Sequence, residues 1–151
     1  MSKFLLQRLK EKFGDGVTEA SSFRGDDVAL VTNEVWHDAV RFLRDDPGCA
    51  CNFFVDLSAV DYPDRSDTEG GRFEVYCILY SIAKKHRVRL KTRVPESDPE
   101  VASLTDLFNG ANWQERECFD MFGVRFRGHP DLRRILMYEE FEGYPLRKDY
   151  P

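Results

Sequence analysis

The segment from Arg72 to Ile82 is apolar on both of the faces that a β-strand would present. A strand of this kind is buried on two sides, so it belongs in the interior of a sheet and not at its edge. The chain is therefore predicted to fold around a sheet in which this segment is central. The two alternating sets are Phe73, Val75, Cys77 and Leu79 against Tyr76, Ile78, Tyr80 and Ile82.

Two more strand patterns flank this segment, at residues 53–60 and 87–94. The second pattern alternates strictly, with Val88, Leu90, Thr92 and Val94 on one side and Arg87, Arg89, Lys91 and Arg93 on the other. A row of basic side chains is usually a solvated sheet face that also discourages edge pairing. A dedicated docking stripe is the alternative.

The remaining patterns complete an α+β order. Helices are predicted at residues 3–13 and 33–44, with two short strands at 17–23 and 28–31 joined by an Arg24–Asp27 turn. Residues 98–108 are weakly helical, and a further helix is predicted from Asn112, capped by Asn112 and Glu115, to a stop at Gly123. The predicted fold is a two-layer α+β domain, with a mixed sheet of about five strands flanked by helices.

The distribution of residue types along the chain changes after residue 122. Glycines and prolines forbid long regular elements there, yet apolar residues recur at intervals up to Tyr150. A solvated tail would not need these residues, whereas an arm laid over another subunit would bury them. Residues 1–122 are therefore predicted to form the globular domain and residues 123–151 an extended C-terminal arm for subunit docking.

Composition excludes several classes of function. The 151 residues suit one domain, and the net charge of −5 disfavours a nucleic-acid binder, which needs a basic face. No window approaches the about 18 apolar residues of a membrane span, and the first residues lack the apolar run of a signal peptide. A cytoplasmic protein is expected, with membrane association only through a partner.

The sequence contains no recognisable set of metal or cofactor ligands. Cys49, Cys51, Cys77 and Cys118 form no CxxC pair or ladder with zinc or iron–sulfur spacing. Cys49 and Cys51 are interpreted as free thiols, with a redox pair as the less favoured alternative, and the other two as core residues. Phosphate loops and nucleophile elbows are missing as well, so no cofactor is expected in this chain.

A charged cluster opens the predicted last helix. Glu115 and Glu117 could suggest a hydrolase, but side chains two apart on a helix point about 200° away from each other. Arg116 and Asp120 are four apart and are expected to pair. No catalytic residue is predicted. One histidine and one aspartate, His129 and Asp131, do not make a metal site.

The stretch from residue 111 to the end resembles the C-subunit (30 kDa subunit) family of respiratory complex I. The Glu-Arg-Glu block at 115–117, the Asp-Met-Phe-Gly at 120–123, the Gly-His-Pro-Asp-Leu-Arg-Arg at 128–134 and the Pro-Leu-Arg-Lys-Asp-Tyr-Pro at 145–151 follow the family's order and spacing. Residues 60–63, 72–76 and the basic strand are also similar, so the resemblance covers about residues 52–151. Residues 138–141 depart from the pattern.

The resemblance implies a structural, cofactor-free subunit in the peripheral arm of a proton-translocating NADH:quinone oxidoreductase. Such a subunit is peripheral, lies at the cytoplasmic face of the inner (plasma) membrane, and packs against the large quinone-module subunit and the cluster-bearing subunit. Flavin and iron–sulfur clusters are expected in partner subunits. The equivalent scaffold subunit of a membrane-bound hydrogenase or other-donor dehydrogenase is the alternative. The residues predicted to form the subunit interface are Glu115, Arg116, Glu117, Asp120, His129, Asp131, Arg133, Arg134, Arg147, Lys148 and Asp149.

Overall fold

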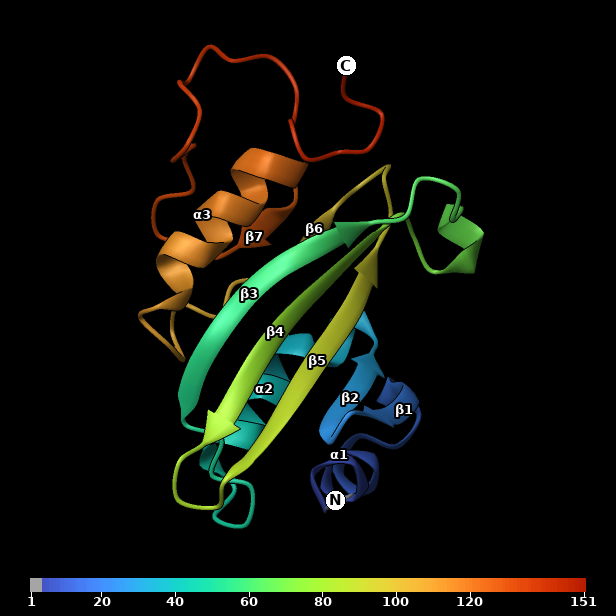
Figure 1. The fold of residues 1–151 in the computed structure, drawn as a ribbon, viewed down its shortest axis with the longest axis vertical. Helices are drawn as coiled ribbons and strands as arrows, with labels where there is room; N and C mark the ends of the chain where they lie inside the picture. Colours follow the sequence, from blue (N-terminus) through green and yellow to red (C-terminus); the bar gives the residue numbers. More distant parts are fainter. Residues whose placement is uncertain (1–3) are drawn as a thin grey trace. The chain divides into compact units, whose positions relative to one another are not determined.

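A computed structural model describes residues 4–151 (Figure 1). Lys3, the first residue of the first predicted helix, lies outside the described residues. The chain divides into two compact units. The first unit comprises the residues up to Asp56 together with Tyr76–Thr92, and the second comprises Leu57–Val75 and Arg93–Pro151.

The main sheet has five strands in the order β1-β2-β5-β4-β3. Strand β4 lies between two neighbours, so the prediction of an interior strand is confirmed. β1 pairs with β2 in antiparallel fashion and β2 pairs with β5 in parallel, which makes the sheet mixed, as predicted. The strands are β1 (Val17–Phe23), β2 (Asp26–Val31), β3 (Phe53–Asp61), β4 (Phe73–Ser81) and β5 (His86–Val94).

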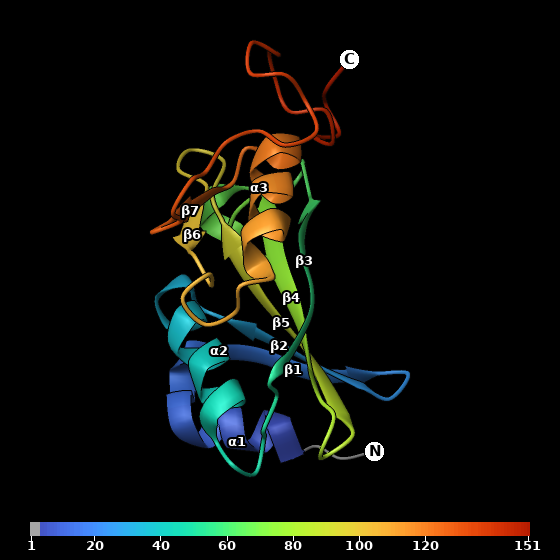
Figure 2. The same ribbon diagram turned by 90° about the vertical axis from the view of Figure 1, so that its left-hand side faces the viewer.

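In the first unit, helices cover only one face of the sheet. Helices α1 (Phe4–Phe13) and α2 (Trp36–Asp45) lie on the same side of it, as Figure 2 shows. Their apolar positions at helical spacing, among them Leu9, Trp36 and Val40, are fully buried. The two layers of the predicted α+β fold are therefore present here.

The uncovered face corrects one expectation about β4. Phe73, Val75, Cys77 and Leu79 are fully buried, as predicted. The second set is not: Tyr76, Ile78 and Tyr80 are only half-buried, and Ile82 lies beyond the strand and is 62% exposed. A strand in the interior of a two-layer fold has neighbours on both edges but a layer on one face only, so sequence apolarity overstated its burial.

The hairpin between β1 and β2 forms as its residues require. Arg24 and Gly25 both have positive φ, 51° and 89°. Two consecutive residues of this kind make the tight two-residue turn whose twist matches that of the flanking strands. The predicted hairpin is confirmed, with β2 beginning at Asp26, two residues earlier than expected.

The second unit contains a small parallel pair of strands and a helix. The pair is β6 (Glu100–Ala102) with β7 (Arg125–Arg127), and the buried Val101 is in register with the buried Phe126. The weak helix predicted at 98–108 is therefore wrong, because pairing with a distant strand outweighs local helix propensity. A short 3-10 turn, Asp67–Glu69, lies in the connection between β3 and β4.

Helix α3 (Ala111–Phe122) ends as predicted but begins differently. Gly123 has φ 81°, the left-handed conformation of a helix stop. The N-cap is Gly110 and no side chain caps the helix, so the predicted capping box is wrong and Glu115 has other partners. From Gly128 onward the chain forms turns and bends without a helix or strand.

Two sequence features have simple structural outcomes. All four cysteines are free thiols buried in the structure, so Cys77 and Cys118 are core residues as predicted. None of the helices in residues 4–151 has the length and apolar character needed to cross a membrane.

Candidate subunit-docking site

The segment after α3, here called the arm (residues 123–151), is held by a buried carboxylate. Asp120 is fully buried, and its Oδ2 accepts hydrogen bonds from the backbone N–H groups of Ile135, Leu136 and Met137 at 3.1, 2.7 and 2.9 Å. Its Oδ1 accepts one from Arg134 Nη1 at 2.7 Å. Burial alone would raise the pKa of Asp120, but these donors outweigh it and the pKa is lowered. Asp120 is therefore a charged fixing point for the arm.

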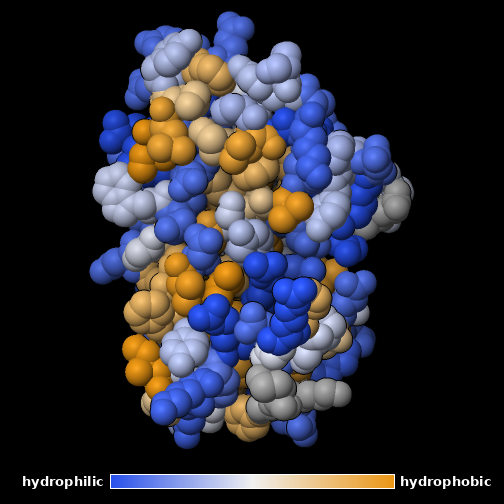
Figure 3. Space-filling model, in the orientation of Figure 1, coloured by the Kyte–Doolittle hydropathy of each residue, from blue (hydrophilic) through white to orange (hydrophobic). Residues whose placement is uncertain are grey.

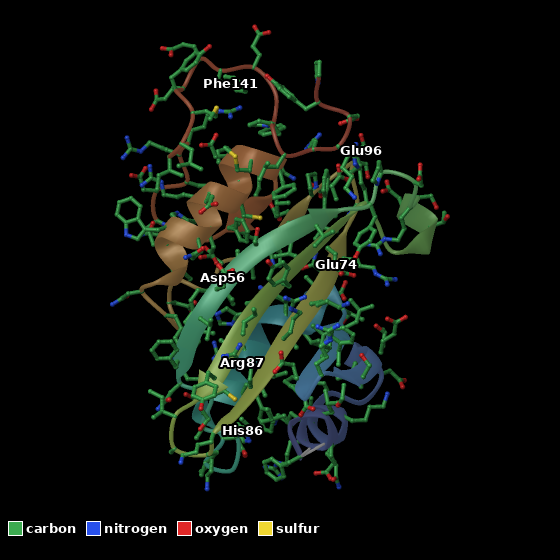
Figure 4. All side chains as sticks on the ribbon, viewed as in Figure 1. Asp56, Glu74, His86, Arg87, Glu96 and Phe141 are labelled. Carbon is green, nitrogen blue, oxygen red and sulfur yellow. The ribbon has the colours of Figure 1, made fainter. Side chains whose placement is uncertain are left out.

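Arg134 extends this fixing point into the arm itself. Its Nη2 donates to the carbonyl of Gly143 at 2.8 Å, and its guanidinium lies 5.5 Å from the ring centre of Phe141 and 5.2 Å from that of Tyr144. Figure 4 labels Phe141 on the outer loop of the arm. Residues 134–144 thus close into a loop around one guanidinium, which suits the planar, multiply donating head of arginine.

A second contact fixes the arm to the C-terminal end of α3. Leu146 N–H donates to the carbonyl of Met121 at 3.0 Å, and Arg147 Nε donates to that of Phe122 at 2.7 Å. The Arg147 guanidinium also lies over the ring of Phe73, 4.8 Å from its centre. These bonds satisfy carbonyls that a helix end leaves without partners.

A third contact fixes the end of the arm to the sheet strands. Arg72, with a side chain only 4% exposed, donates to both carboxylate oxygens of Asp61 at 2.6 and 2.8 Å and to Asp149 at 3.0 Å. Lys148 N–H donates to Asp61 Oδ2 at 2.7 Å, and Glu96 accepts from Arg72 at 3.2 Å. Burial would raise the pKa of Asp61, but Arg72 and the Lys148 amide lower it. The Asp61 and Asp149 bonds raise the pKa of Arg72.

Glu115 is fully buried on α3 and binds within the chain. It accepts hydrogen bonds from Ser103 Oγ at 2.6 Å and from Leu104 N–H at 2.7 Å. Burial raises its pKa to about 7, and the two donors offset only part of that effect. Glu115 therefore ties the connection after β6 to α3, and no cation among the described residues pairs with it.

The expected pair between Arg116 and Asp120 is wrong. Arg116 donates instead to the carbonyls of Arg133 and Arg134, at 3.1 and 3.0 Å. It also lies 5.1 Å from the ring centre of Trp113. Asp120 is enclosed by arm backbone donors, which a local i,i+4 rule does not consider.

The other predicted interface residues lie nearer the surface. His129 Nε2 is 3.2 Å from the Asn112 carbonyl, and Asp131 and Arg133 form an exposed ion pair at 2.8 Å. Glu117 and Lys148 are exposed. The predicted set thus separates into two buried carboxyls, Asp120, which holds the arm, and Glu115, which holds the connection after β6. Four members are half-buried: Arg116, His129, Arg134 and Arg147. The exposed members are Glu117, Asp131, Arg133, Lys148 and Asp149.

The arm, once fixed, displays apolar side chains outward. Leu136 is 59% exposed, Tyr138 66% and Leu146 53%, and Trp113 on α3 is 59% exposed. Exposed apolar side chains that lie close together on a fixed segment make a candidate docking surface. We call these four residues the arm surface.

Sequence reasoning missed the partners that hold the arm. Asp61 and Arg72 were not predicted to act there, although opposite charges at the end of β3 and just before β4 are a signal for a pair across that connection. The backbone donors at 135–137 and the carbonyls at the end of α3 carry no sequence signal, since every residue has a carbonyl and every residue except proline has an N–H.

Two solved structures contain this fold. Nqo5, as a trypsin-resistant fragment (1-134), matches with a TM-score of 0.72 at 30% identity, covering 85% of this chain and 100% of that one. A chain of the membrane-bound sulfane sulfur reductase, an archaeal respiratory membrane complex, matches with a TM-score of 0.78 at 23% identity, over 97% and 84% of the two chains. The second likeness concerns the fold alone.

Sequence comparison then identifies the family. The model of the respiratory-chain NADH dehydrogenase 30 Kd subunit matches residues 29–151. The C subunit of the NADH-quinone oxidoreductase of Roseiflexus castenholzii is 50% identical over 97% of this chain and 82% of its own length. Its counterpart in Geobacter sulfurreducens is 44% identical over 95% and 86%. The chain belongs to the respiratory-chain NADH dehydrogenase 30 kDa subunit family, and the match extends well upstream of residue 52, where the resemblance by motifs begins.

Proposed function

We propose that this chain is a structural subunit in the peripheral arm of a proton-translocating NADH:quinone oxidoreductase. In this role it supports electron transfer from NADH through iron–sulfur clusters to quinone without an active site of its own. Family membership and the names of the relatives support the assembly. The observation that carries the structural role is the arm, fixed from within by Asp120 while its apolar side chains face outward.

The arm surface is proposed to dock on the large quinone-module subunit, with the cluster-bearing subunit as the second partner. Exposed charges beside it, Arg133 and Lys148, would pair with partner carboxylates. Buried Asp120 and half-buried Arg134 would act indirectly, by presenting the arm in one conformation. Pre-ordering lowers the entropic cost of association. The complex would hold the subunit at the cytoplasmic face of the membrane.

The cofactors of the reaction are proposed to lie in partner subunits. Within residues 4–151, no three His, Cys, Asp or Glu side chains are grouped to hold a metal ion. The cysteines lie apart from water, and burial raises the pKa of Cys49 and Cys51 to about 12, which disfavours the thiolates that clusters need. Stoichiometric iron or a visible absorption band in the pure chain would contradict this.

The docking role can be tested by charging the arm surface. Leu136→Asp with Leu146→Asp places two carboxylates on exposed positions and leaves the backbone bonds to Asp120 and Met121 available. The isolated variant should unfold with the wild-type midpoint, while the amount of other subunits that co-purify with the tagged chain falls at least tenfold. Phe23→Asp, at a 65% exposed apolar position on β1, is the matched control and should assemble normally.

Two results would refute the docking role. Wild-type assembly of the Leu136→Asp, Leu146→Asp variant would mean that the arm surface is not an interface. Normal assembly with loss of NADH-dependent quinone reduction per complex would mean that the arm takes part in the reaction itself.

A further inference from the structure

The face of the sheet opposite α1 and α2 is open to solvent in the first unit. Figure 3 shows this face, on which hydrophilic and hydrophobic side chains mix. Strand β5 presents Arg87 and Arg89 there, both exposed, and β4 presents the half-buried Tyr76 and Tyr80. Figure 4 shows Arg87 near the start of β5.

Each of the two arginines stacks on a tyrosine ring, and neither is paired with a carboxylate of the described residues. The Arg89 guanidinium lies 4.6 Å from the ring centre of Tyr76, and that of Arg87 lies 5.7 Å from that of Tyr80. Neither arginine forms an ion pair with any described residue. Arg93 on the same strand differs, since it lies 3.5 Å from Glu74. Two oriented cations are therefore left with their charge uncompensated in a chain of net charge −5.

Edge protection does not account for these arginines. A basic row discourages unwanted pairing only on a strand whose backbone is free. Strand β5 lies between β2 and β4 in the sheet, and its residues 88–91 are in register with β2, so this part of the strand is not a free edge. Protection against edge pairing, one of the two reasons for expecting only a solvated basic face, therefore does not apply to this strand.

Apolar side chains surround the arginine–tyrosine pairs. Val28 on β2 is in register with Arg89 and is half-buried, Ile78 lies between the two tyrosines along β4, and Ile82 is 62% exposed. Arginine and tyrosine are the residue types enriched at the energetic centres of protein interfaces, where a ring holds the guanidinium and apolar neighbours exclude water.

We propose that this surface, formed by Arg87, Arg89, Tyr76, Tyr80 and Ile78 and here called the arginine–tyrosine face, docks an acidic surface of a second protein subunit. The partner would present two carboxylates about 7 Å apart, the spacing of alternate residues on one side of a strand. Each guanidinium can receive one carboxylate through paired hydrogen bonds while its ring contact persists. The inference rests on the proposed role as a subunit and adds an interface separate from the arm surface.

A protein partner fits better than nucleic acid or lipid. Strong phosphate binding requires many cations on one face, because affinity grows with the number of phosphates neutralised. Here two unpaired cations lie among apolar side chains, on an acidic chain. Few charges and much apolar area are the properties of a protein interface.

The test is charge reversal at both arginines. Arg87→Glu with Arg89→Glu should leave the unfolding midpoint close to wild type, because both side chains are exposed and form no ion pair. Recovery of other subunits with the tagged chain should fall at least tenfold. The control is Lys12→Glu with Arg41→Glu, which also reverses two positive charges at exposed positions, on α1 and α2, and should assemble normally; Arg41 lies 3.9 Å from Asp38 in an exposed pair that contributes little to stability.

The outcomes separate this inference from the proposed function. Normal assembly of the Arg87→Glu, Arg89→Glu variant, together with loss of assembly on charging the arm surface, would overturn the arginine–tyrosine face alone. Normal assembly of both variants would also overturn the proposed function. Binding of duplex DNA or phosphatidylglycerol vesicles that is abolished by the same reversal, without any effect on assembly, would assign the face to a phosphate ligand and overturn the protein partner.

Discussion

At the residue scale, the arm is held by hydrogen bonds to the carboxylate of Asp120 more than by apolar packing. The arm has too few buried apolar side chains to pack by itself, and Asp120 compensates with three backbone N–H donors and a guanidinium. A buried charge is stable only when it is paired and hydrogen-bonded in this way. The order of residues 134–137 of the arm therefore depends on the ionised form of Asp120.

Replacing Asp120 by asparagine should be costly. The asparagine amide has one acceptor oxygen and carries no charge. Arg134 therefore loses its counter-ion, or the backbone N–H groups of the arm lose their acceptor oxygen. We expect the free energy of unfolding, measured with urea, to fall by about 3 kcal/mol, the scale for breaking a buried pair. Asp131→Asn removes an exposed pair with Arg133 and is the control, with little change expected. Equal effects of the two would contradict this account.

Gly123 is the second residue on which the arm depends. Its φ is +81°, and a Cβ there would lie 2.7 Å from Arg147 Nη2 and 2.8 Å from the Tyr144 ring. Gly123→Ala should destabilise the chain by more than about 1 kcal/mol and speed proteolysis within the arm. Gly128→Ala provides the control: φ is +90°, but nothing lies within 4 Å of the added Cβ. The difference in unfolding free energy between the two variants measures the cost of the steric contact. Equal losses would mean that Arg147 and Tyr144 can move away from the added methyl group at little cost.

At the scale of elements, α3 is joined to its surroundings through polar side chains on different turns. Glu115 holds the residues after β6, and Asp120 holds the arm. The two carboxyls respond to burial in opposite directions, because backbone donors and an arginine surround Asp120 whereas Glu115 has two neutral donors and no cation. One helix thus carries one acid that stays charged and one that takes up a proton near neutrality.

The raised pKa of Glu115 predicts a pH-dependent stability. The pKa is about 7 in the folded chain and 4.5 ordinarily, so the folded state binds more protons between these values. Stability is then complete below pH 4.5 and falls as pH rises to 7, by about 1.4 kcal/mol per pH unit and roughly 3 kcal/mol in total. Glu115→Gln should flatten this slope, because the glutamine side chain does not titrate. The fold should be kept, since the amide oxygen can accept from Leu104 N–H and the NH2 group can donate to Ser103 Oγ. Urea unfolding at pH 5, 6 and 7 would measure it, and an unchanged slope would exclude Glu115 as the cause.

At the scale of the whole molecule, fixed carboxylates set the acid limit of stability. Asp61 and Asp120 have pKa values below the ordinary 3.8 because arginines and backbone donors hold them charged. The unfolded chain binds their protons first, so this stability is complete above about pH 4 and is lost as pH falls further. With the Glu115 effect, the unfolding free energy should be greatest near pH 4 to 5. A maximum above pH 7 would contradict the Glu115 assignment, and stability that kept rising as the pH fell below 4 would contradict the assignments of Asp61 and Asp120.

Local periodicity in the sequence was enough to predict the two layers, the interior position of β4, the hairpin at Arg24 and Gly25, and the helix stop at Gly123. These features follow from side-chain alternation and backbone preference within a few residues. Which charges meet became evident only in the folded chain. Asp120 meets residues 15 to 17 positions away and Asp149 meets Arg72 across 77, and pairing over such separations depends on the closed fold, which no local rule contains. For the same reason, Glu100–Ala102, within the segment predicted as a helix, pair as β6 with the distant β7. The contacts between the arm and α3 likewise decide which members of the predicted interface are buried and which are exposed.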